Sequence, residues 1–115
     1  MKQVLLFTFL MIFSNHLISQ TITVLSPNGG EQISGCTNYT ISWDSPGSST
    51  YFNVDYSTDG GNTWSSIASS YQSNSLVWNA PYIYSTTCLI KVYDANNFSI
   101  FDESDSYFSV LCTQT

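Results

Sequence analysis

Short stretches in which apolar and polar residues alternate make up most of the chain after residue 20. Alternation with a period of two places successive side chains on opposite faces of an extended strand, and clusters of Gly, Pro, Asn, Ser and Asp separate the stretches. No stretch shows the period of a helix. Seven strands are therefore predicted, at Thr21–Leu25, Asn38–Asp44, Tyr51–Ser57, Thr63–Ala68, Ser75–Asn79, Cys88–Asp94 and Ser106–Cys112.

The same alternation predicts which side chains form the core. The expected inward residues are aromatic or aliphatic, namely Tyr39, Ile41, Trp43, Phe52, Val54, Tyr56, Leu76, Trp78, Ile90, Val92, Phe108 and Val110. Many short strands with turn residues between them are typical of two packed sheets. We therefore predict an all-β fold, a seven-stranded antiparallel β-sandwich of the immunoglobulin or fibronectin-III type.

The first 20 residues have the pattern of a signal peptide. A charged start at Lys2 precedes an apolar run from Val4 to Phe13 that only Thr8 interrupts, and a polar stretch follows. The run is too short for a permanent transmembrane helix. We expect residues 1–20 to be removed, and residues 21–115 to form one domain that is secreted or held at the cell surface, with no membrane span after cleavage.

Removal of the leader also changes the chemistry that the chain can perform. The only histidine, His16, is lost with the leader, and Lys91 is left as the single basic side chain against eight Asp and Glu, a side-chain charge of −7. A surface of that sign repels phosphates, so we expect no binding to nucleic acid or anionic lipid. Without histidine there is no Ser-His-Asp or Cys-His nucleophile and no His-ligated zinc site. We predict a domain that is not an enzyme and needs no cofactor or metal.

A glycine turn between two predicted strands carries the most specific motif. The segment from Ser57 to Trp64 reads S-T-D-G-G-N-T-W. Its spacing, S-x-D-x-G-x-T-W, resembles the Asp-box hairpin of many secreted sugar-handling and surface proteins. We expect the Asp carboxylate to accept hydrogen bonds from the turn, the glycines to take positive φ, and the Trp to lie beneath the turn. The role predicted for these residues is structural: Ser57, Asp59, Gly61, Thr63 and Trp64.

Three cysteines, Cys36, Cys88 and Cys112, remain in the exported part of the chain. Small exported domains commonly use disulfides, and an up-and-down strand order places all three residues at one end of the sandwich. We predict a Cys36–Cys88 disulfide, which closes a loop of about 52 residues. The alternatives are a Cys88–Cys112 disulfide and three buried free thiols. In the predicted pairing, Cys112 is available as a tether to a partner.

Several segments together resemble a known domain family. They are Ser26–Glu31, Gly35–Cys36, Ile41–Trp43, Val54–Trp64, Val77–Pro81, Cys88–Val92 and Asp102–Val110. The set resembles the Ser/Thr-rich, yeast cell-wall-synthesis-like N-terminal sandwich domain, which occurs in GPI-anchored fungal wall proteins and in secreted surface proteins of Bacteroidetes. The resemblance implies a fibronectin-III-like spacer or adhesion module without catalysis, and a disulfide at the places of Cys36 and Cys88.

The end of the sandwich opposite the cysteines is expected to carry ligand-binding loops. The long connection from residue 94 to residue 106 is the main candidate, with Asp94, Phe98, Phe101, Asp102, Glu103 and Asp105. We predict a non-catalytic module for adhesion, spacing or protein interaction at the cell envelope, with an envelope protein or a polysaccharide as partner.

Three other functions are alternatives. Carbohydrate binding is suggested by rings that can stack on sugars, those of Tyr51, Tyr71, Tyr82, Tyr84 and Tyr107. Calcium binding is suggested by the acidic residues of the loop end. Glycoside hydrolysis would need a pair of carboxylates such as Asp102 and Asp105, in a domain that is small for an enclosed active site.

Overall fold

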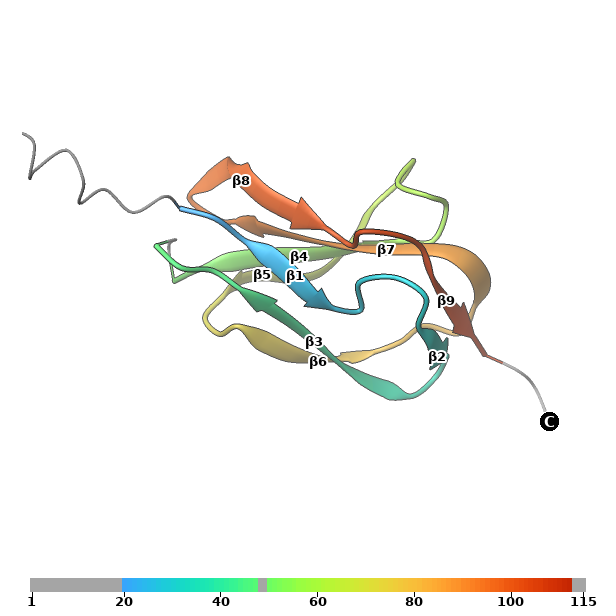
Figure 1. Ribbon diagram of the computed structural model, residues 1–115. Coiled ribbons are helices and arrows are strands. Elements are labelled where there is room, and N and C mark those ends of the chain that lie inside the picture. The colour runs from blue at the N-terminus through green and yellow to red at the C-terminus, as the bar shows by residue number, and fades with distance from the viewer. Residues whose placement is uncertain (1–19, 48–49, 113–115) are drawn as a thin grey trace, which may run out of the picture.

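The computed structural model describes residues 20–47 and 50–112, and within these ranges the chain forms nine strands and no helix (Figure 1). The predicted leader lies outside the described residues except for Gln20. No helix with the length and apolar character of a membrane span is present in the described part of the chain. The prediction of an all-β fold is confirmed.

Two sheets face each other in Figure 1. The first has three antiparallel strands in the order β1-β3-β6. They are β1 (Thr23–Ser26), β3 (Asn38–Asp44) and β6 (Ser75–Asn79). The second has six strands, with the order β2-β9-β7-β4-β5 and with β8 also paired to β7. They are β2 (Gln32–Ser34), β4 (Phe52–Ser57), β5 (Ser65–Tyr71), β7 (Tyr84–Asp94), β8 (Asn97–Glu103) and β9 (Phe108–Leu111).

Strands β8 and β9 follow one another along the same edge of β7. Strand β4 occupies the opposite edge, so the pairing of β8 with Lys91–Asp94 and of β9 with Tyr84–Cys88 uses the remaining edge. At the break between them, the buried hydroxyl of Ser104 donates to the Pro27 carbonyl oxygen at 2.8 Å and accepts from the Ile90 amide at 3.0 Å. The pairing along this edge of β7 is interrupted here, and the two hydrogen bonds of Ser104 satisfy the buried backbone groups.

The strand count and direction differ from the prediction. Each of the seven predicted strands overlaps an observed one, and β3 and β6 match it residue for residue, but β2 and β8 were not predicted. In addition, β2 pairs with β9 in parallel, so the larger sheet is mixed rather than antiparallel. Strand β2 has three residues, which is too few to show an alternation, and β8 carries Phe, Ile and Phe at irregular spacing among polar residues.

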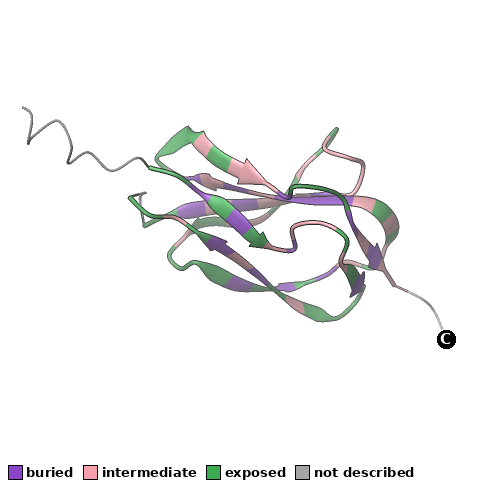
Figure 2. Cartoon of the chain, viewed as in Figure 1, coloured by how far each residue is buried: buried purple, intermediate pink, exposed green. Residues whose placement is uncertain are grey.

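The core lies between the two sheets (Figure 2). The residues predicted to face inward are buried, except that Tyr39 and Tyr56 are half-buried. Aromatic side chains make contacts from one sheet to the other. The Trp78 ring of β6 lies 5.3 Å from the Tyr56 ring of β4 and 6.5 Å from the Phe108 ring of β9, and Trp43 of β3 lies 5.6 Å from Phe52 of β4, all measured between ring centroids. The described residues form a β-sandwich-like fold.

Candidate functional site

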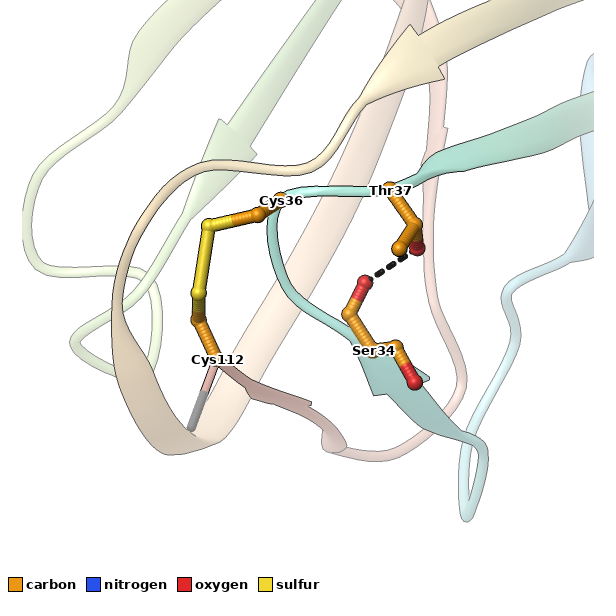
Figure 3. Close-up of a disulfide and its surroundings, with 4 residues drawn as sticks. All are labelled: Ser34, Cys36, Thr37 and Cys112. Carbon is orange, nitrogen blue, oxygen red and sulfur yellow. Dashed lines mark hydrogen bonds between the residues drawn. A yellow bond between two sulfur atoms is a disulfide. The ribbon is translucent and has the colours of Figure 1, made fainter. Parts of the chain in front are cut away.

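The disulfide joins Cys36 and Cys112 (Figure 3). Cys88 is a free thiol whose side chain is only 1 % exposed. The predicted Cys36–Cys88 disulfide is therefore wrong, and so is the alternative between Cys88 and Cys112. Cys112 is not available as a tether to a partner in this pairing.

The missed strand β2 explains the error. Its parallel pairing with β9 sets Ser34 opposite Leu111, and the Gly35 amide donates to the Leu111 carbonyl oxygen at 3.1 Å, so the next residues of both strands meet. A Cβ atom at Gly35 would lie 2.9 Å from the Cys112 nitrogen, which explains why glycine precedes Cys36. Strand β7 begins four residues before Cys88, which places this side chain within the core and not at the end of the sandwich.

A group of aromatic rings surrounds the only described lysine on the outer face of the six-stranded sheet. The Lys91 Nζ atom lies 5.4 Å from the ring centroid of Trp64, 5.7 Å from that of Tyr93 and 5.2 Å from that of Phe101. The Phe98 ring packs edge-on against Tyr93 at 5.2 Å. We call these five residues the aromatic face. Ammonium groups at this distance from aromatic rings are attracted by the negative potential of the ring face.

The strand register explains how these residues come together. Lys91 and Tyr93 alternate along β7 with the buried Ile90 and Val92, so both point away from the core. Phe101 of β8 is the register partner of Tyr93. Phe98 and Phe101 are 66 % and 50 % exposed, which is unusual for phenylalanine and leaves their rings available for contact.

The predicted ligand loop from residue 94 to residue 106 is mostly not a loop. Asp94 ends β7, and Phe98, Phe101, Asp102 and Glu103 lie on β8, so that of the six predicted ligand residues only Asp105 is outside a strand. The segment folds back as a hairpin because its amides and carbonyls pair with β7. The two phenylalanines therefore belong to a sheet face, where their positions are fixed.

Three carboxylates of this region accept hydrogen bonds within the fold. Asp94 is buried and accepts a hydrogen bond from the Asn96 amide at 2.8 Å. Asp102 accepts from the Val24 amide at 2.8 Å, and Asp105 accepts from the Asn28 side-chain amide at 2.9 Å. In the part of the chain that the structure describes, no three His, Cys, Asp or Glu side chains are grouped to hold a metal ion.

One carboxylate lies beside the aromatic face. Asp55 of β4 is the register partner of Lys91, and its Oδ2 accepts a hydrogen bond from the Tyr93 hydroxyl at 3.2 Å. Partial burial raises the pKa of Asp55, while the Tyr93 hydrogen bond and the Lys91 charge act in the opposite direction. Burial also raises the pKa of Tyr93, and the negative charge of Asp55 adds to this increase. Asp55 thus places a carboxylate beside the rings and the Lys91 ammonium group of the aromatic face.

An open cleft of about 370 Å³ adjoins the aromatic face at the break between β8 and β9. Its lining residues come from the glycine turn, β7 and this break, namely Gly60, Leu89, Glu103, Ser104, Asp105, Ser106 and Tyr107. Glu103 is the register partner of Lys91, which makes the cleft continuous with the face. Of the five tyrosines suggested by the sequence for sugar stacking, only Tyr107 lines this cleft, and Tyr71 packs against Trp43 at 6.4 Å.

The glycine turn beside the cleft is held by the Asp59 carboxylate. It accepts from the Ser57 hydroxyl at 2.8 Å, the Thr63 amide at 2.9 Å and the Thr63 hydroxyl at 2.6 Å. Gly60 and Gly61 have φ of 74° and 94°, conformations that suit glycine. The hydrogen bonds from Thr63, followed by that from Ser57, lower the pKa of Asp59 to about 2. Trp64, at the end of this turn, is half-buried and its ring faces Lys91.

The lowered pKa predicts a dependence of stability on pH. Because the folded-state pKa of Asp59 lies below its usual value of 3.8, its stabilising effect is complete above about pH 4 and is lost as the pH falls towards about 2. The Asp59→Asn variant cannot titrate at this position. We expect the variant to be less stable than the wild type at pH 6 and the difference to shrink between pH 4 and pH 2, as measured by urea denaturation. A difference that stays constant over this range would contradict the prediction.

Comparison with known proteins found no matching family model, no matching curated protein and no matching solved structure.

Proposed function

We propose that this chain is a non-catalytic interaction module at the cell envelope, used for adhesion or spacing, and that the aromatic face is its binding surface. The observation that carries the proposal is the exposure of Phe98 and Phe101 beside Lys91 on a rigid sheet. Aromatic side chains are enriched at the centres of protein interfaces because they remove a large apolar area from water at a small cost in side-chain entropy. Burial of these two rings by a partner is therefore favourable.

The proposed location rests on the apolar run of residues 4–13 and on the Cys36–Cys112 disulfide, since disulfides persist mainly outside the reducing cytoplasm. The proposed fold type is immunoglobulin-like or fibronectin-III-like. Support comes from the strand orders β1-β3-β6 and β9-β7-β4-β5. The chain passes several times from one of the two facing sheets to the other, as it does in sandwiches of this type. Rigid sandwiches of this type commonly present a binding surface without catalysis.

Carbohydrate binding is a second candidate, and the cleft favours it. Flat rings at the aromatic face lie next to hydrogen-bonding groups of the cleft, among them Glu103, Asp105 and the Tyr107 hydroxyl. Sugars are bound by rings that stack on their apolar faces together with polar groups that pair with their hydroxyls. A polysaccharide chain crossing from the cleft to the aromatic face would meet both.

The test uses isolated envelope fragments of the source organism and the Phe98→Ser, Phe101→Ser double variant. Both side chains are exposed, so the fold should be retained. We expect the double variant to bind the fragments at least tenfold more weakly in a sedimentation assay, which is the loss of about 1.4 kcal/mol or more that central aromatic contacts give. The control is the Leu25→Ser, Val77→Ser double variant, which removes two exposed apolar side chains of the smaller sheet and should bind as the wild type does.

Pretreatment of the fragments separates the two candidates. Protease removes a protein partner and leaves polysaccharide, whereas periodate oxidises sugar diols and leaves most of the protein. Loss of binding after protease alone supports protein interaction, and loss after periodate alone supports carbohydrate binding. Equal binding by the wild type and the Phe98, Phe101 double variant would show that the aromatic face is not the binding surface.

A further inference from the structure

The two ends of the described chain lie at opposite ends of the sandwich. In Figure 1 the chain enters β1 at the left end and leaves β9 at the right end, where β2 also lies. Residues 20–36 therefore cross the whole molecule before they reach the disulfide. Tension applied to the two ends of the chain acts along the length of the sheets.

The disulfide provides a second covalent path for such tension. It connects Cys36, just after β2, to Cys112, just after β9, across a sequence separation of 76. Strands β3 to β9 all lie within the loop that this bond closes. A force that enters before β1 passes along residues 20–36, crosses the two sulfur atoms and leaves after Cys112. The backbone of residues 37–111 is not part of this covalent path, so tension between the two ends cannot extend it while the disulfide is intact.

We propose that the Cys36–Cys112 disulfide makes this domain a load-bearing link, which transmits tension between its ends without extending the chain of strands β3 to β9. This inference rests on the proposed function and specifies its mechanical part. Every residue of the aromatic face has a number between 36 and 112, so the proposed binding surface lies inside the protected loop. An adhesion module needs its binding surface to keep its shape while the attached cell pulls on it.

Among the described residues, only those before Cys36 can lengthen under load, and this segment is held along its length. β1 pairs with β3, and β2 pairs in parallel with β9. Backbone hydrogen bonds link Gly30 to Tyr107 at 2.9 Å, Ser109 to Glu31 at 2.8 Å and Gly35 to Leu111 at 3.1 Å. These bonds lie across the direction of tension along β2. Tension therefore loads all of them at once in shear, and they do not open one at a time.

The test is single-molecule force spectroscopy of the exported chain with a handle at each end, with and without a reducing agent. The disulfide joins residues 76 positions apart, and an extended chain measures about 3.4 Å per residue. The intact bond therefore keeps about 260 Å of chain from contributing to the extension, and we call this the hidden length. We expect complete unfolding to release about 260 Å less length without reductant than with it. The length measured is informative even if the reduced chain does not fold, because an unfolded chain simply extends to its full length.

Two variants complete the experiment. Cys36→Ser should release the full length without reductant, and Cys88→Ala should still hide about 260 Å. A Cys36–Cys88 bond would instead hide about 180 Å, and a Cys88–Cys112 bond about 80 Å, so the measured length identifies the pairing. Equal lengths with and without reductant would overturn the proposal. If the chain binds envelope fragments but hides no length without reductant, the proposed function stands and the mechanical proposal fails. If the chain hides this length but does not bind envelope fragments, the mechanical proposal stands and the proposed function fails.

Discussion

Replacing Cys112 by serine is expected to lower the free energy of unfolding by about 4 kcal/mol. The disulfide joins residues separated by 76 positions, whose Cα atoms lie 6.0 Å apart in the folded state. A cross-link between distant residues restricts the unfolded chain much more than the folded one, so its loss stabilises the unfolded chain. Urea denaturation of the wild type and the variant without reductant measures the difference.

The other two cysteines provide the controls for this prediction. Cys36→Ser should cost the same as Cys112→Ser, and the double variant should cost no more than either, because all three remove one bond. Cys88→Ala should cost only about 1 kcal/mol, the loss of one buried sulfur atom, and should keep the sensitivity of the wild type to reductant. If Cys88→Ala were as damaging as Cys112→Ser and abolished that sensitivity, the pairing would be different.

Replacing Trp78 by alanine is expected to lower the free energy of unfolding by about 3 to 5 kcal/mol. This ring belongs to the smaller sheet and contacts Tyr56 and Phe108 of the larger one, at 5.3 Å and 6.5 Å between ring centroids. Its removal leaves a cavity at the contact between the sheets that the surrounding strands cannot fill. The shift of the urea midpoint, at unchanged slope, measures the loss.

The neighbouring residue supplies the control, since Val77 lies on the same strand with its side chain on the outer face and 64 % exposed. Val77→Ala should change the free energy of unfolding by no more than about 0.5 kcal/mol. Trp78→Phe retains part of the inter-sheet contact and should cost less than Trp78→Ala, so it remains measurable if the alanine variant does not fold. Similar costs for Val77→Ala and Trp78→Ala would show that the core does not lie where the structure places it.

Local patterns were sufficient where a strand is long and has one buried face. The alternation of Tyr39, Ile41 and Trp43 marks β3, and that of Leu76 and Trp78 marks β6, because a two-residue period leaves one choice of buried face. The same reasoning failed for β2, which contributes a single buried side chain, Ile33. A strand of three residues is stabilised by hydrogen bonds to its partner β9, and it is too short to show an alternating pattern.

The candidate site depended much more on the fold. Phe98 and Phe101 were predicted as ligand residues, but in a loop, because nothing in Asn97–Glu103 indicates a strand until β7 is available to pair with it. Trp64 was predicted as a structural part of the turn, and its contact with Lys91 joins segments 27 residues apart in the sequence. Such contacts follow from strand order and register, which local patterns do not specify.

The amino-acid sequence alone determined that the chain is built of short strands, which side chains of the longer strands are buried, and how few ionisable groups are present for catalysis. These properties depend on each residue and its near neighbours. The tertiary structure decided which cysteines are paired and which rings gather around Lys91. The cysteine pairing depends on the parallel β2–β9 pair, whose strands lie far apart in the sequence. The ring group depends on the register of β8 against β7 and on the position of Trp64 beside Lys91, and neither can be read from near neighbours alone.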